Sequence, residues 1–351
     1  MTGQKSLVAL LLTGTLATAL AMAQARLAMA QARADAAADF YRGKTVSFII
    51  GSGEAGVYDL GGRLMARYLA RYIPGNPTVV PQNMPGASSV RAASYIYSVA
   101  PHDGTVFGTA QPTIVLNKLL DPAATYVPEK FTWIGRLQPV TLVGVAWKSA
   151  PEHTMADARA RPFIVSASGA SGTSAIVPWA LNRLIGTNFK VVSGYTSLTP
   201  QLLAMERGEV EGIGSASLSD VLKHQDWIKD DKVSYLYTIA TQRSTELPDV
   251  PTIVEFAEND LDRAVLRLLG SVTDIGFTIM APPDVPADRT ASLRQAFVAM
   301  VKDPDFRTEA AEIGLVPEPM SGEDVQKIVG NTLGATGEAV QRLRDVTQPQ
   351  R

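Results

Sequence analysis

The chain has no cysteine and only three histidines among its 351 residues. Without cysteine, disulfides and thiolate metal sites are excluded, and the absence agrees with export to an oxidising compartment. His102, His153 and His224 are scattered at no spacing typical of metal ligands, which indicates surface or turn residues rather than a zinc or haem site. We therefore expect no cofactor.

Charge is also scarce, and so are long apolar runs. Charged residues make up 19% of the chain and the net charge is −2, which leaves no electrostatic case for binding nucleic acid. Beyond the N-terminus, no apolar run reaches the length of a membrane span.

The N-terminus has the layout of a secretory signal peptide. A short basic start, Met1–Lys5, precedes the uncharged run Ser6–Ala23, and small-x-small sites end at Ala23, Ala30 and Ala36. We expect residues 1–30 to be removed and the mature protein to be periplasmic, with cleavage after Ala23 or Ala36 as alternatives. An uncleaved anchor stays open because the apolar run is of borderline length.

The remaining residues, about 320, suffice for two domains. Strands expected at Thr45–Ile50, Thr78–Pro81 and Thr105–Thr109 alternate with helices that run to Tyr72 and over Val90–Val99. Strand, helix and strand in this order predict a mostly parallel sheet covered by helices.

The same rhythm restarts at Phe163–Ser166 and continues to Ala240. Two apolar stretches, Trp133–Trp147 and Ile275–Met280, are interpreted as strands that cross between two lobes and form a hinge. The first lobe is expected to comprise residues 40–140 and 276–351, and the second residues 141–275. The final part of the chain is expected to be helical, with one helix capped by Ser321.

A glycine-rich loop follows the first expected strand and precedes a helix. Backbone N–H groups at such a helix start favour an anion, and glycine lets a ligand approach closely. Asp59 is expected mainly to cap the helix. The candidate ligand-binding residues in this loop are Ser52, Gly53, Glu54, Ala55, Gly56, Val57, Tyr58 and Asp59.

The loop also matches the dinucleotide fingerprint G-x-G-x-x-G at Gly51, Gly53 and Gly56. The acid that would bind a ribose about 20 residues later is missing, because no Asp or Glu occurs between Asp59 and Asp103. An exported dinucleotide-binding enzyme therefore remains only an alternative.

A second polar loop occupies the same position in the second α/β unit. Its hydroxyls and N–H groups predict a second anion cradle facing the first, and its candidate residues are Ser168, Gly169, Ala170, Ser171, Gly172, Thr173 and Ser174. A serine hydrolase is excluded because the chain has no G-x-S-x-G at this loop and no histidine after His224. We find no nucleophile–base pair and predict that the protein is not an enzyme.

Several segments resemble one known family. Asn83-Met84-Pro85-Gly86-Ala87 and Ala100-Pro101-His102-Asp103-Gly104 are similar to the N-x-P-G-A and A-P-D-G-Y segments of the Bug receptors, the substrate-binding proteins of tripartite tricarboxylate transporters. Leu247-Pro248-Asp249-Val250-Pro251-Thr252, with Arg243-Ser244 before it, resembles their L-P-D-V-P-T region. The resemblance runs from about Phe40 to the end of the chain.

The resemblance implies an α/β, two-lobed Venus-flytrap fold of the periplasmic-binding-protein type, with two mostly parallel sheets flanked by helices and joined by crossing strands. It also implies that the two loops hold a carboxylate through amides, hydroxyls and waters. This chain departs from the family pattern at Glu54, which either points to solvent or accepts hydrogen bonds from a ligand, and at Tyr58. A family aspartate that can face a ligand amine aligns near Ser215, and a family histidine is replaced by Ala175. Tyr195 is expected to reach the cleft or to lie on the lobe surface.

The resulting hypothesis is a periplasmic solute-binding protein that captures a small organic acid between two lobes. It would deliver the acid, as a monomer, to integral-membrane transporter subunits. A ligand-sensing subunit of a signalling system is the remaining alternative.

Overall fold

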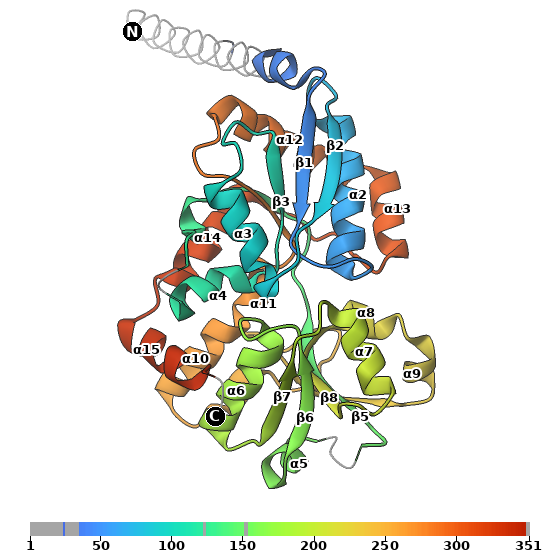
Figure 1. Ribbon diagram of the computed structural model, residues 1–351, viewed down its shortest axis with the longest axis vertical. Coiled ribbons are helices and arrows are strands. Elements are labelled where there is room, and N and C mark those ends of the chain that lie inside the picture. The colour runs from blue at the N-terminus through green and yellow to red at the C-terminus, as the bar shows by residue number, and fades with distance from the viewer. Residues whose placement is uncertain (1–23, 25–34, 122–123, 151–153, 349–351) are drawn as a thin grey trace, which may run out of the picture.

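The computed structural model describes residue 24 and residues 35–121, 124–150 and 154–348. Apart from Gln24, the expected signal peptide lies outside these residues. The described chain forms two α/β lobes, one above the other in Figure 1, each built on one sheet. No helix in the described ranges is both long and apolar enough to cross a membrane.

The sheet of the first lobe has six strands. β1 pairs in parallel with β2 and β3, whereas β10, β4 and β11 pair antiparallel. In spatial order the strands are β11 (Met320–Ser321), β4 (Thr132–Arg136), β10 (Thr278–Ala281), β3 (Val106–Thr109), β1 (Thr45–Ile50) and β2 (Thr78–Asn83).

Helices cover both faces of this sheet because its strands are apolar on both sides. Phe48 and Ile50 enter one hydrophobic core and Ile49 enters the other, as the alternation of side chains along a strand requires. The first core is covered by α2 (Val57–Tyr72), α12 (Ala287–Lys302) and α13 (Pro304–Glu312). The second is covered by α3 (Val90–Ser98), α4 (Thr113–Leu120) and α14 (Gly322–Leu333), with the short helices η1 (Ala87–Ser89) and η2 (Pro128–Lys130) beside it.

The second lobe repeats this plan on a five-stranded sheet. Its strands in spatial order are β7 (Phe189–Ser193), β6 (Phe163–Ala167), β8 (Gly212–Ser217), β5 (Leu142–Trp147) and β9 (Val233–Thr238). One face is covered by α6 (Thr173–Ile185), η3 (Ile253–Phe256) and α10 (Asp260–Gly270), and the other by α7 (Leu198–Glu206), α8 (Leu218–Leu222) and α9 (Gln225–Lys229). α5 (Met155–Ala160) precedes β6, and α11 (Val272–Ile275) follows α10.

The two-lobed α/β fold expected from the sequence is confirmed, but the sheets are mixed rather than mostly parallel. Each has a parallel half, β2-β1-β3 or β7-β6-β8, and an antiparallel half. The antiparallel half includes β4, β5 and β10, which lead into or out of the crossings between the lobes. Strands that enter a sheet from the opposite lobe have no crossover helix to bring them into parallel register.

The crossings are two short segments rather than continuous strands. Residues 137–141 connect β4 to β5, and residues 276–277 connect α11 to β10. The two segments run side by side, because Leu137 N–H donates to the Phe277 carbonyl at 2.8 Å and Phe277 N–H donates to the Gln138 carbonyl at 2.9 Å. This hydrogen-bonded pair of segments joins the lobes.

The lobe limits inferred from the sequence stay a prediction. The last helix, however, packs on the second lobe, although the sequence analysis assigned it to the first. α15 (Gly337–Val346) packs on α10 and α6 of the second lobe and also contacts α4. Leu343 and Val346 are buried there, and Arg344 Nε donates to the Leu119 carbonyl at 2.7 Å. The apolar face of α15 therefore packs with the second lobe, whereas α12, α13 and α14 pack on the sheet of the first.

Candidate functional site

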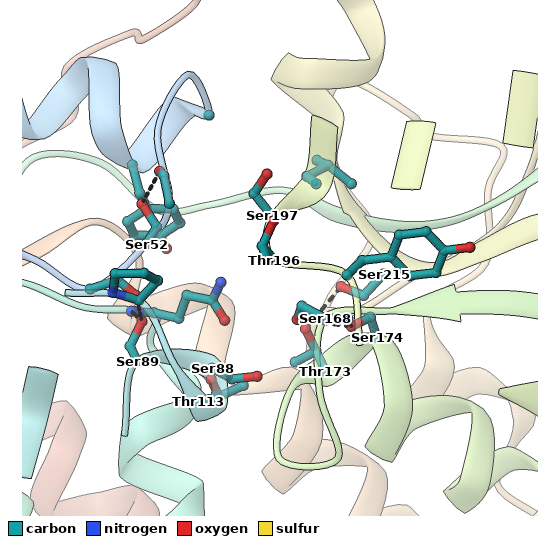
Figure 2. A pocket seen from close by; sticks show the side chains of 18 of the residues that line it. Ser52, Ser88, Ser89, Thr113, Ser168, Thr173, Ser174, Thr196, Ser197 and Ser215 are labelled. Carbon is teal, nitrogen blue, oxygen red and sulfur yellow. Dashed lines mark hydrogen bonds between the residues drawn. The ribbon is translucent and has the colours of Figure 1, made fainter. Parts of the chain in front are cut away.

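A cavity of about 350 Å³ lies between the two lobes, within the size range of small-molecule sites. It opens where the parallel strands of both sheets end, which is where ligands bind in open α/β sheets. Figure 2 shows hydroxyl side chains from both lobes facing each other across it. The labelled ones are Ser52, Ser88, Ser89 and Thr113 from the first lobe, and Ser168, Thr173, Ser174, Thr196, Ser197 and Ser215 from the second.

The lobes touch each other at two places beside the cavity. Ser171 Oγ donates to the Ala87 carbonyl at 3.0 Å. A Cβ added at Gly53 would lie 3.6 Å from the Thr196 carbonyl oxygen, and one added at Gly172 would lie 2.7 Å from Ser88 Oγ. Glycine at Gly172 therefore permits this approach of the two lobes.

Asp59 braces the first loop instead of capping the helix with its side chain. The N-cap of α2 is Gly56, and no side chain caps it. Asp59 is buried, and its carboxylate accepts from the Ala55 N–H at 3.0 Å, from Arg63 Nε at 2.9 Å and from Asn83 Nδ2 at 2.8 Å. These bonds hold Ala55 at a left-handed φ of 68° and fix the loop against β2.

The second loop is organised by its own hydroxyls. Ser174 Oγ accepts from the Ser168 N–H at 3.2 Å, and Thr173 Oγ1 donates to Ser215 Oγ at 2.9 Å. Thr173 and Ser174 are the first two residues of α6. The loop, the helix start and the end of β8 thus present their polar atoms to one side of the cavity.

Besides the two predicted loops, the segment after β2 also lines the cavity, although the sequence analysis did not assign it to the site. Ala87, Ser88 and Ser89 have φ values of 44°, 50° and 71°, a strained run of non-glycine residues. Ser89 Oγ donates to the Gly51 carbonyl at 2.7 Å and accepts from the Gln111 N–H at 3.0 Å. These bonds tie the ends of β1, β2 and β3 together at the cavity.

Two buried hydroxyls on the first-lobe side of the cavity, one in this segment and one at the start of α4, have no hydrogen-bond partner. Ser88 is 7% exposed and Thr113 is 2% exposed, and neither Ser88 Oγ nor Thr113 Oγ1 makes a hydrogen bond. Both residues line the cavity. Because an unmade buried hydrogen bond is costly, these atoms mark places where a ligand or its water would bind.

Positive potential in the cavity comes from the backbone. Val57, Thr113, Thr173 and Leu198 are the first residues of α2, α4, α6 and α7, and all four line it. The N–H groups of a first helical turn have no acceptor inside the helix, and the helix dipole favours an anion there. Of the described residues in the lining, none is Lys, Arg or His.

Tyr58 closes one side of the cavity. Its ring packs on Phe277 with centroids 4.6 Å apart. Burial raises the pKa of Tyr58 far above its usual value, and the nearby charge of Asp220 raises it further. The hydroxyl is therefore protonated at neutral pH and is able to donate.

Ten of the predicted ligand-binding residues line the cavity: Ser52, Gly53, Gly56, Val57, Tyr58, Ser168, Thr173, Ser174, Tyr195 and Ser215. Seven do not. Glu54 and Ala170 are exposed, and the side chain of Asp59 is engaged inside the loop. The others are Ala55, Gly169, Ser171 and Gly172, of which Ser171 and Gly172 contact the opposite lobe.

The sequence analysis missed the lining residues of three segments, residues 85–89, 111–113 and 196–198, and also Gly51, Leu142, Gly194, Gln201, Ser217 and Asp220. The first two segments follow β2 and β3, so the rule that ligands bind beyond the ends of parallel strands could have found them. Asp220 lies on α8, and no local pattern marks it.

The described residues hold no group of three or more His, Cys, Asp or Glu side chains suited to a metal ion.

We expect Ser171→Ala to weaken ligand binding about twofold to tenfold. The lost hydrogen bond to Ala87 joins the lobes only when they are closed, and one such bond is worth about 0.5–1.5 kcal/mol. Isothermal titration calorimetry checks this, with Ser98→Ala, an exposed change outside the cavity, as the control. Equal affinities for Ser171→Ala and the wild type would contradict a closed bound state.

Comparison with known proteins finds related sequences. A sequence profile for the tripartite tricarboxylate transporter family receptor matches residues 63–344. The UPF0065 protein in the gbd 5' region of Cupriavidus necator is 24% identical over 335 residues, which cover 92% of this chain and 95% of that protein.

Two solved structures have a similar fold. One is R. palustris Rpa4515 with adipate, at 23% identity and a TM-score of 0.65, covering 86% of this chain and 97% of that chain. The other is MatC (Rpa3494) from Rhodopseudomonas palustris with bound malate, at 21% identity and a TM-score of 0.65, covering 87% of this chain and 99% of that chain.

Proposed function

The chain belongs to the tripartite tricarboxylate transporter family of receptors, and on that premise we propose that it captures a small carboxylate between its lobes in the periplasm. It then delivers the carboxylate to the membrane subunits of a transporter. The observation that carries the proposal is the cavity itself, where four helix starts and two unpartnered buried hydroxyls converge. The described lining residues include no Lys, Arg or His side chain.

A carboxylate suits such a cavity better than a cation does. Two oxygens carrying one negative charge accept several hydrogen bonds at once, and bonds to a charged acceptor are about twice as strong as neutral ones. A cation would meet the positive ends of α2, α4, α6 and α7. The bound adipate of Rpa4515 and the bound malate of MatC support the same ligand class.

The residues that line the cavity suit reversible ligand binding rather than catalysis. Its lining is dominated by hydroxyls, glycines and aliphatic or aromatic groups, and its one carboxylate among the described residues is Asp220. Glycoside hydrolysis, for example, uses a pair of carboxylates, and this lining has only one among its described residues. The receptors of this family are binding proteins, in agreement with this composition.

A thermal-shift screen of small carboxylates on the purified mature protein tests the proposal. A ligand present at a hundredfold excess over its dissociation constant stabilises the folded state by about 2.7 kcal/mol, which raises the unfolding temperature by several degrees. NAD serves as the control for the G-x-G-x-x-G loop. A shift with NAD and with no carboxylate would refute the carboxylate receptor. Uptake of the identified acid by cells with and without the receptor gene then tests delivery.

A further inference from the structure

Asp220 is the one carboxylate in the cavity wall among the described residues. It lies on α8 and is 8% exposed. Lys223 Nζ is 2.8 Å from Asp220 Oδ1, but Lys223 does not line the cavity. A carboxylate has lone pairs on both oxygens, so the ion pair leaves Asp220 able to accept a further hydrogen bond from a ligand.

Asp220 and the unpartnered hydroxyls lie at opposite sides of the cavity. Figure 1 shows α2 directly above α8 on one side and α4 above α6 on the other. Tyr58 of α2 is close enough to Asp220 for the charge of Asp220 to raise the pKa of Tyr58. Ser88 instead faces the start of α6, since a Cβ at Gly172 would lie 2.7 Å from Ser88 Oγ. The cavity therefore has a side of unpartnered hydroxyls and a side with a carboxylate whose cationic partner, Lys223, lies outside the lining.

The two sides of the cavity favour different chemical groups of a ligand. The starts of α4 and α6, with Ser88 and Thr113, suit a carboxylate. A second carboxylate at the other side would face Asp220 without a lining cation between them, and like charges brought together in a desolvated site repel strongly. A hydroxyl or an ammonium group placed there would donate to Asp220.

We propose that the ligand is a small monocarboxylate with a hydroxyl or an ammonium group at its other end, and that Asp220 selects it against dicarboxylates. This assignment rests on the proposed function of the cavity as a carboxylate site. It distinguishes this chain from a receptor for a plain diacid, because Asp220 accepts a donor where a diacid would present a second negative charge.

Calorimetry with four five-carbon acids tests the assignment. Pentanoate, glutarate, 5-hydroxypentanoate and 5-aminopentanoate differ only in the group at the far end, and the same series with four and six carbons covers other lengths. We expect the hydroxy or amino acid of at least one length to bind about tenfold more tightly than the matching diacid and the unsubstituted acid.

Asp220→Asn separates the two kinds of donor. The neutral amide still accepts a hydrogen bond from a hydroxyl, so the hydroxy acid should lose little affinity, whereas an amino acid should lose about tenfold and the diacid should gain affinity. Asp226→Asn is the matched control, because Asp226 lies on α9 of the same lobe, pairs with Lys232 and does not line the cavity. It should leave all four affinities unchanged.

The outcomes are distinguishable. If no acid of any length binds, the proposed function and the assignment fail together. If diacids bind the wild type as tightly as the hydroxy and amino acids, or if Asp220→Asn does not raise the affinity for the diacid, the assignment alone fails. The ranking measured on the wild type decides the question even if Asp220→Asn does not fold.

Discussion

Gly276→Ala is expected to lower the free energy of unfolding by about 3 kcal/mol or more. Gly276 has φ 62° and ψ −146°, a conformation open almost only to glycine. A Cβ at this position would lie 2.3 Å from the Gln138 carbonyl oxygen and 2.8 Å from the Pro139 Cα. That same oxygen accepts the hydrogen bond from Phe277 N–H, so the overlap cannot be relieved without separating the two crossing segments.

Urea unfolding followed by circular dichroism measures this loss. Gly43→Ala is the matched control, because Gly43 also has a positive φ of 71° but no atom within 4 Å of the added Cβ. Gly43→Ala should lower the free energy of unfolding only by the backbone cost of a left-handed residue, about 1–2 kcal/mol. Equal losses in the two variants would show that the crossing segments yield to the added methyl group.

Thr113→Val is expected to weaken carboxylate binding by about tenfold to a hundredfold and to leave the unliganded protein at least as stable. A hydrogen bond to a charged group is worth about 1.5–3 kcal/mol, and valine cannot make it. In the free protein, Thr113 Oγ1 is buried without a partner, so its removal costs no existing hydrogen bond. Binding and stability therefore change in opposite directions, which a general loss of structure would not produce.

Thr109→Val provides the control for this prediction. Thr109 Oγ1 is likewise buried and unpartnered, but Thr109 does not line the cavity. Calorimetry and thermal unfolding of both variants should show equal or raised stability in each, and weaker binding in Thr113→Val alone. If both variants bind as the wild type does, Thr113 does not contact the ligand.

Local sequence patterns predicted much of the fold. The strand at Thr45–Ile50 has the predicted bounds, and the helix capped by Ser321 begins as predicted, with Ser321 Oγ accepting from the Asp324 N–H at 3.1 Å. These features depend on hydrophobic periodicity and on hydrogen bonds between residues a few positions apart. The positions of the two polar loops followed as well, because each loop joins the end of a parallel strand to a helix, and ligands bind beyond such strand ends.

Long-range contacts were outside the reach of those patterns. Asp59 looked like a helix cap, but its partners include Asn83, 24 residues away. α15 carries a helical apolar stripe that fits either lobe, and only its packing on α10 and α6 decides between them. The antiparallel halves of both sheets likewise depend on how the crossing strands enter the opposite lobe.

The sequence by itself determined that this protein has two α/β units with a polar loop at each, because strand and helix periods and glycine positions are local properties of the chain. Only the tertiary structure decided which side chains the cavity contains. Ser88 and Thr113 come from two elements of the first lobe and Asp220 from α8 of the second, and only the packing of the two lobes places all three around one cavity. The two polar loops could thus be predicted from residues, whereas the presence of Asp220 in the cavity wall could not.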